Sequence, residues 1–159
     1  MNIQLFRIDD RLIHGQVVIG WVNHLCSKQI ILCDNSVCEN DWEKELYLSI
    51  VPENLKARVL SVNELAEVLK SGEFDLSKTI ILVNNPQVIE ELLDQDVELE
   101  KINIGGIHFK EGRSKYLSYL YLSSEEVSSF SRLVNQGIAL HCQDVPDAKK
   151  VPITNLIVN

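Results

Sequence analysis

The segment Ile80-Ile81-Leu82-Val83 is apolar at four consecutive positions, so both of its faces are expected to be buried. Such runs are typical of parallel strands that helices cover on both sides. Together with this run, which spans residues 79–83, the β-branched and apolar stretches of the chain give seven candidate strands. The other six cover residues 3–8, 29–33, 57–60, 101–104, 119–122 and 138–142.

Segments with apolar residues at helical spacing lie between most of these strands and predict helices. They cover residues 17–25, 42–50, 62–69, 88–93 and 127–134. Ser61 and Ser123 each precede a glutamate by three positions, a spacing typical of the capping box that starts a helix. The alternation predicts an α/β fold: an open, mostly parallel sheet of about six or seven strands with helices on both faces.

Length and composition limit the class of protein. A chain of 159 residues, 45% of them hydrophobic, is expected to form a single domain over residues 1–159. It carries 15 Lys and Arg against 23 Asp and Glu, a net charge of −8, which disfavours nucleic acid as a partner. No apolar run approaches the roughly 18 residues of a membrane span, and no charged leader precedes an apolar core. We therefore expect a cytoplasmic protein.

The four cysteines and the C-terminal segment predict no site. The cysteines include no C-x-x-C pair, so we interpret them as reduced packing residues rather than metal ligands or disulfide partners. Residues 145–159 show no clear period and are expected to wrap the surface.

The segment RIDDRLIHGQ, residues 7–16, brings two arginines, two aspartates and a histidine to the junction of the first strand and the first helix. Ligands of α/β proteins bind beyond the carboxyl ends of the strands, and a helix start favours anions. We predict that His14 is a nucleophile, that Arg11 binds phosphate oxygens, and that Gly15 opens the backbone to close approach.

The two aspartates have less definite roles. Either Asp9 or Asp10 can fix the imidazole tautomer, and Asp10 is also a candidate at the phosphate. Carboxylates repel phosphate, so both rank below Arg11. The alternative is that His14 is an ordinary loop histidine and that residues 9–11 form a capping turn with a surface ion pair.

A second glycine-rich segment, residues 103–113, follows the fifth strand. If it lies beside the first loop, the amides of Gly105 and Gly106 and the side chains of Lys110 or Arg113 reach the same phosphate. The alternative is a flexible turn into a solvated basic loop.

The remaining histidines and the nucleotide motifs add little. His24 and His141 have no clustered partners in the sequence and are interpreted as structural, and His108 ranks below His14 as a candidate site residue. The chain contains neither a Walker A loop nor G-x-G-x-x-G, so a side chain is a better candidate than a bound nucleotide for carrying phosphate.

Residues 7–17, with Asn103-Ile104-Gly105-Gly106, His108-Phe109 and the segment at residues 143–146, resemble the signature of IIB subunits of mannose/fructose/sorbose-type sugar phosphotransferase systems. The resemblance spans essentially the whole chain in the order of the family. It implies that His14 accepts a phosphoryl group at Nδ1 from a IIA histidine, with Arg11 steadying that group. The loop at residues 108–113 and the serine- and tyrosine-rich residues 114–121 depart from what we expect of the family.

The resemblance also implies partners. His14 would pass the phosphoryl group to a sugar that enters through the membrane subunits IIC and IID, beside which this chain would lie on the cytoplasmic side as a subunit of a phosphohistidine–sugar phosphotransferase. The phosphoryl transfer that the resemblance implies requires no metal and no other cofactor. Arg7, Lys110 and Arg113 are the candidate partner-facing residues, and the identity of the sugar cannot be inferred because other chains determine it.

Two other functions remain open. One is a noncatalytic α/β module that senses a phosphorylated metabolite through the same loop. The other, weaker, is an acid–base hydrolase of phosphate esters that uses His14 and Asp9.

Overall fold

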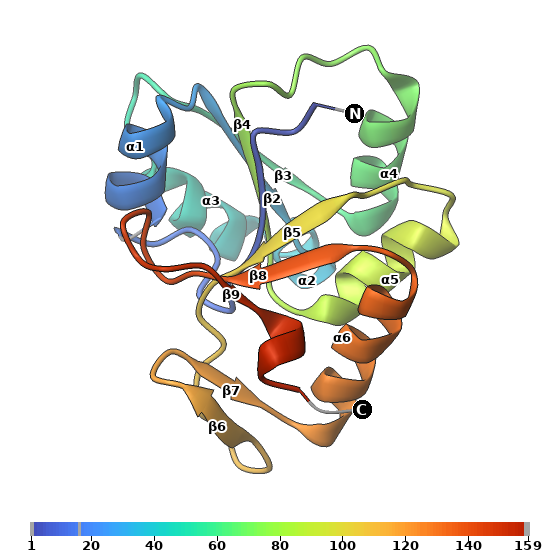
Figure 1. The fold of residues 1–159 in the computed structure, drawn as a ribbon. Helices are drawn as coiled ribbons and strands as arrows, with labels where there is room; N and C mark the ends of the chain where they lie inside the picture. Colours follow the sequence, from blue (N-terminus) through green and yellow to red (C-terminus); the bar gives the residue numbers. More distant parts are fainter. Residues whose placement is uncertain (1, 16, 158–159) are drawn as a thin grey trace.

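The computed structural model describes residues 2–15 and 17–157. Its main sheet has seven strands in the order β3-β2-β4-β1-β5-β8-β9, and every pair is parallel except β8 with β9. The α/β prediction is confirmed (Figure 1). The strands are β1 (Leu5–Ile8), β2 (Gln29–Cys33), β3 (Lys56–Leu60), β4 (Thr79–Val83), β5 (Lys101–Ile104), β8 (Ala139–Cys142) and β9 (Val151–Pro152).

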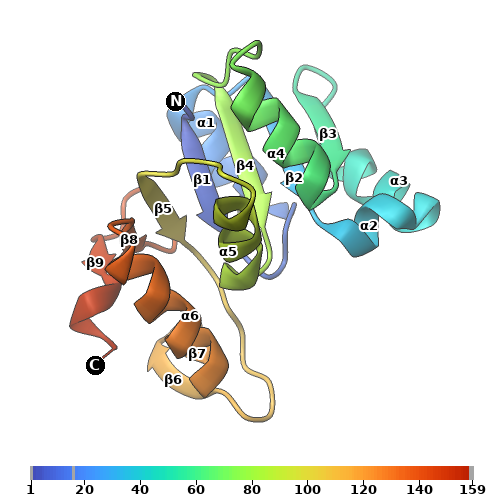
Figure 2. The same cartoon turned by 90° about the vertical axis from the view of Figure 1, so that its right-hand side faces the viewer.

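Helices cover both faces of the sheet: α4, α5 and α6 lie on one face (Figure 2), and η1 lies on the other. These three pack their apolar stripes with Ile8, Ile31 and Ile81 in one core, and η1 packs with Ile30 and Leu82 in the other. β4 is buried at all five positions because it contributes to both cores. The helices are the π-helix η1 (Val17–Val22), α1 (Asn23–Leu25), α2 (Asn35–Glu39), α3 (Asp41–Ile50), α4 (Val62–Ser71), α5 (Pro86–Asp94), α6 (Ser124–Asn135) and the 3-10 helix η2 (Ile153–Asn155).

Two expectations for the edge of the sheet are wrong. The strand expected at residues 119–122 forms as β7 (Leu120–Leu122), but it pairs antiparallel with β6 (Ser114–Leu117) in a separate two-stranded sheet. A two-residue turn joins the two strands, and so short a connection permits only antiparallel pairing. The seventh strand of the main sheet is β9, from the C-terminal segment, which also buries Ile153 and Ile157 in the core instead of lying on the surface.

Local signals explain most helix boundaries. Both expected capping boxes form: the Ser61 and Ser123 hydroxyls each accept a hydrogen bond from the backbone N–H three residues on. No periodic pattern predicts α2, whose five residues follow the N-cap Asp34. The helix expected over residues 17–25 begins as a π-helix, a rare form that is frequent at functional sites.

The cysteines are not all packing residues. Burial raises the pKa of Cys33 and Cys142 to about 12, which fits inert packed thiols. Cys26, in contrast, is exposed in a left-handed turn at the end of α1, and Cys38 is half-buried.

Substituting Ser123→Ala should lower the free energy of unfolding by about 1 kcal/mol, because it leaves a backbone N–H of the first turn of α6 without its acceptor. Ser128→Ala is the matched control, because its exposed hydroxyl only donates to a carbonyl within the same helix. Urea unfolding of both variants measures the difference. Equal stabilities would contradict the assignment of Ser123 as the cap.

Candidate functional site

The loop at residues 9–14 lies where β1 ends, in the middle of the sheet between β4 and β5. The Asp9 N–H donates to the Val83 carbonyl at 2.9 Å, and the Asp10 N–H donates to the Gly106 carbonyl at 2.9 Å. The loop is thereby joined to the segments that follow both neighbouring strands. The expected proximity of the two glycine-containing loops is confirmed.

Two apolar residues fix the shape of this loop. Leu12 adopts a left-handed backbone with φ of 58°, which costs a leucine on the order of 1 kcal/mol. Leu12 and Ile13 are both buried in the core beneath η1, and the Leu12 N–H donates to the Asp9 carbonyl. Burial of these two side chains holds the tight turn that leads into His14.

Asp9 is the centre of the site. Its carboxylate is fully buried and accepts hydrogen bonds from the Arg11 backbone N–H (3.1 Å), from His14 Nε2 (3.1 Å) and from Arg7 Nη2 (3.4 Å). Burial opposes ionisation of Asp9, but the hydrogen bond and charge of His14 and the charge of Arg7 outweigh it and lower the pKa. The group therefore remains a carboxylate.

This contact defines the chemistry of His14. An ionised carboxylate only accepts hydrogen bonds, so the Nε2 atom of His14 carries the hydrogen that Asp9 accepts. The lone pair of the neutral imidazole then resides on Nδ1. His14 is partly exposed, with 16% of its side chain accessible, so a reactant can reach it.

Arg7 is not partner-facing: its side chain is wholly buried, so the prediction that it meets another protein is wrong. It donates to Asn103 Oδ1, to the Gln143 carbonyl at 2.8 Å and to the Asp144 carbonyl at 2.9 Å, and its guanidinium lies 5.0 Å from the centre of the Trp21 ring. A guanidinium with this many acceptors can be buried beside a carboxylate. Arg7 thus supports Asp9 from below.

The two glycines make room for side chains. The Gly105 N–H donates to the Ile8 carbonyl at 2.7 Å, so it is unavailable to phosphate, and the predicted role of that amide is wrong. A Cβ atom at residue 105 would overlap the Arg7 guanidinium. A Cβ atom at residue 106 would lie 2.6 Å from His108 Cε1 and 3.4 Å from Arg11 Nη2. Phosphate binding by the Gly106 amide remains a prediction.

Asp10 forms a second aspartate–histidine pair. Its Oδ1 lies 2.6 Å from His108 Nδ1, and its Oδ2 accepts from the His108 backbone N–H at 2.8 Å. Both oxygens of Asp10 therefore hold the loop after β5, and its contact with phosphate stays a prediction. Arg113 is also occupied: it pairs with Glu126 at 2.8 Å and approaches Asp10 at 3.6 Å. With 12% of its side chain accessible, Arg113 is not the partner-facing cation that we expected.

Arg11, Gly15 and Lys110 remain accessible. The Arg11 side chain is 41% exposed, with its Nε 3.5 Å from Asp9 Oδ1, so it lies on the solvent side of the buried carboxylate. Gly15 is exposed and has open space where a Cβ atom would stand. Lys110 is exposed on the loop after β5.

Sequence reasoning missed the residues that support the site. Asn103 and Gln143 are buried and polar, and each contacts Arg7. The available signal was a polar residue inside or directly after an otherwise apolar strand. Asp9 has a larger role in the site than its predicted rank below Arg11 indicates, because that role depends on the burial of Arg7.

Comparison with known proteins gives a consistent result. The family model described as "PTS system sorbose subfamily IIB component" matches residues 3–159. The chain is 28% identical over 159 residues to the fructose-specific EIIB component of the PTS of Bacillus subtilis (strain 168), covering 100% of this chain and 98% of the relative. It is 32% identical over 140 residues to the sorbose-specific EIIB component of Lacticaseibacillus casei, covering 88% and 85%.

Solved structures agree. The IIBSor domain of the sorbose permease from Klebsiella pneumoniae superposes with a TM-score of 0.87 at 28% identity, covering 98% of this chain and 95% of that one. A structure described as a phosphoenolpyruvate-dependent phosphotransferase system superposes with a TM-score of 0.89 at 28% identity, covering 98% and 97%.

Asp9→Asn should lower the free energy of unfolding at neutral pH by about 3 kcal/mol, because it leaves the buried Arg7 charge without its carboxylate. The folded-state pKa of Asp9 lies below its ordinary value of 3.8. The stability that ionised Asp9 contributes is therefore present above that value and is lost as the pH falls through the folded-state pKa. Urea unfolding across this range should show the difference between wild type and variant shrinking. A difference independent of pH would refute this, and exposed Asp147→Asn is the control.

Proposed function

Because this chain belongs to the sorbose subfamily of PTS IIB components, sugar-specific subunits of the sorbose/mannose family, we propose that His14 carries a phosphoryl group between two partners. The observation that supports this most directly is the hydrogen bond between His14 Nε2 and the buried Asp9 carboxylate. It fixes the ring and leaves Nδ1 as the nucleophile.

The transfer occurs in two steps. The Nδ1 lone pair attacks the phosphorus of a phosphohistidine on a IIA protein; the P–N bond of the donor breaks, and its electron pair stays with the donor imidazole. A sugar hydroxyl oxygen later attacks the same phosphorus. The P–Nδ1 bond breaks, its electron pair returns to Nδ1 of His14, and the hydroxyl proton passes to solvent water. Such transfers depend mainly on positioning and on stabilising charge over the phosphoryl oxygens.

Arg11 is the residue best placed to stabilise that charge. It is exposed on the side of Asp9 that faces solvent, whereas Arg7 is enclosed and has its own acceptors. A guanidinium donates to two phosphoryl oxygens at once. Gly15, with open space around it at the start of the helical segment, leaves the backbone accessible to the same group.

The surroundings of His14 suit a protein partner. Ile19 is 69% exposed and Phe109 is 68% exposed, on the helix that follows the His14 loop and on the loop after β5, respectively. Aromatic side chains are enriched in protein interfaces, and Lys110 adds a cation beside Phe109. We propose this surface as the contact with IIA and with the membrane subunits.

The proposed place of action is the cytoplasmic side of the membrane, beside IIC and IID. In the described part of the chain, every helix is too short or too polar to cross a bilayer. The relatives are described as specific for fructose or sorbose, and we propose that the sugar of this system is chosen largely by its membrane subunits.

Incubation with phosphoenolpyruvate, the general phosphotransfer proteins and a cognate IIA should place an acid-labile, base-stable phosphate on His14 of wild type. His14→Ala should take up no label while keeping its far-UV circular dichroism spectrum and thermal transition. Label that persists on His14→Ala, for example at His108, would contradict the assignment of His14 as the phosphoryl acceptor.

Arg11→Ala should slow phosphoryl transfer roughly a hundredfold, as expected when one charged donor to a transition state is lost. Its free energy of unfolding should change by less than about 0.5 kcal/mol, because the side chain is half exposed. Quench-flow measurement of phosphoryl uptake gives the rate. Arg132→Ala is the control that should leave the rate unchanged, because it removes an exposed arginine of α6 that pairs with Glu90 of α5. If Arg11→Ala unfolds the protein, its role is structural.

A further inference from the structure

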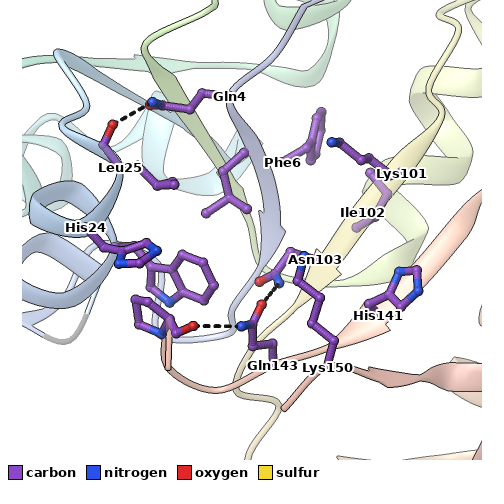
Figure 3. Close-up of a pocket in the computed structure, with 13 residues that line it drawn as sticks. Gln4, Phe6, His24, Leu25, Lys101, Ile102, Asn103, His141, Gln143 and Lys150 are labelled. Carbon is purple, nitrogen blue, oxygen red and sulfur yellow. Dashed lines mark hydrogen bonds between the residues drawn. The ribbon is translucent and has the colours of Figure 1, made fainter. Parts of the chain in front are cut away.

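The face of the sheet over β1, β5 and β8 has an open cavity lined by both polar and apolar side chains. Along β5 and β8, Ile102, Ile104, Leu140 and Cys142 belong to the core that α4, α5 and α6 cover. Side chains alternate across a strand, so Lys101, Asn103 and His141 point to the opposite face. There they line a cavity of about 330 Å³ between the sheet and the η1–α1 segment (Figure 3).

The charge of this cavity is opposite to that of the protein. Its lining includes Lys101, Lys150, His24 and His141 but no aspartate or glutamate, although the chain has a net charge of −8. Within residues 2–15 and 17–157, none of the ion pairs includes any of these four residues. Figure 3 shows His24 on the helical side and Lys101 and His141 on the opposite side. Two unpaired lysines at one cavity, with two imidazole rings beside them, favour an anion.

The cations at the cavity are lysines rather than arginines, which favours phosphate over carboxylate as the bound anion. No arginine lines the cavity, so it lacks the planar fork that binds a carboxylate in two places. Lysines act as point charges and are common ligands of tetrahedral phosphate. The volume is at the small end of ligand pockets and suits a small phosphate or phosphate monoester.

The floor of the cavity is tied to the site at His14. Asn103 Nδ2 donates to Gln143 Oε1 at 3.3 Å, as the dashed line in Figure 3 shows, and both residues accept hydrogen bonds from Arg7. Gln143 Nε2 donates to the Pro146 and Ala148 carbonyls, each at 3.0 Å, and so holds the loop that carries Lys150. Arg7 in turn contacts Asp9, which orients His14.

We propose that this cavity binds a small phosphate-bearing anion at a site separate from His14, with Lys101 and Lys150 as its principal ligands. The proposal goes beyond the phosphoryl-carrier function and does not depend on it, because none of the ligands takes part in the transfer. Through Asn103, Gln143 and Arg7, the occupied cavity contacts the residues that hold Asp9.

Isothermal titration calorimetry of the full chain with inorganic phosphate and with glycerol phosphate tests the proposal. Both probes should bind saturably and more weakly as salt increases, whereas glycerol and malonate should not bind measurably. The double variant Lys101→Gln/Lys150→Gln should bind at least about tenfold more weakly, since it loses two charged donors. Lys115→Gln/Lys149→Gln, which removes two exposed lysines outside the lining, should bind like wild type.

A parallel titration of the double variant Arg11→Ala/His14→Ala separates the two sites. This variant lacks the proposed phosphoryl acceptor and the arginine proposed to bind its phosphate, and it keeps the cavity. It should therefore bind the probes with unchanged affinity, and the ring signals of His24 and His141 should shift in its NMR spectrum. The proposal is wrong if no saturable binding occurs, if malonate binds equally well, if Lys101→Gln/Lys150→Gln binds like wild type, or if Arg11→Ala/His14→Ala loses binding.

Discussion

The buried ion pair between Arg7 and Asp9 is the interaction on which the site depends. Two charges removed from water carry a large desolvation cost, which their mutual attraction and additional hydrogen bonds offset. Here Asp9 accepts from three groups, while Arg7 donates to carbonyls of the loop after β8 and to Asn103 on β5. The pair therefore joins β1 to β5 and to the loop after β8, and it orients His14 at the same time.

This arrangement separates two roles that the motif places side by side. The buried Arg7 neutralises the Asp9 carboxylate and fixes its position, so Asp9 can accept a hydrogen bond from Nε2 of His14 and stay ionised. The outer arginine, Arg11, stays accessible to a reactant. On the other side of the same loop, Asp10 fixes His108 and the segment after β5. Asp9 and Asp10 thus each position a histidine. Asp9 contacts Nε2 of His14 and leaves its Nδ1 open, whereas Asp10 contacts Nδ1 of His108.

Much of this fold could be predicted because its signals are local. The apolar run in β4 requires burial on both faces, and the serines at residues 61 and 123 start helices by hydrogen bonds three residues away. What could not be predicted depends on contacts distant in sequence. Arg7 resembles a surface cation in the sequence, but the loop after β8 supplies the carbonyl of Gln143, 136 residues away, as its acceptor. The two-residue strand β9 is too short to show a period in the sequence. Gly105 resembles a glycine of a phosphate-binding loop, but in the structure it makes room for the Arg7 side chain.

The central claim is that Asp9 leaves Nδ1 of His14 as the atom that takes the phosphoryl group. Long-range proton–nitrogen NMR correlation of the phosphorylated protein distinguishes the two ring nitrogens directly. The buried Asp9 contact predicts phosphorus coupling to Nδ1 and a hydrogen on Nε2 that is protected from exchange with solvent. A phosphoryl group on Nε2 would contradict the account, because that nitrogen could not be phosphorylated while it donates to Asp9.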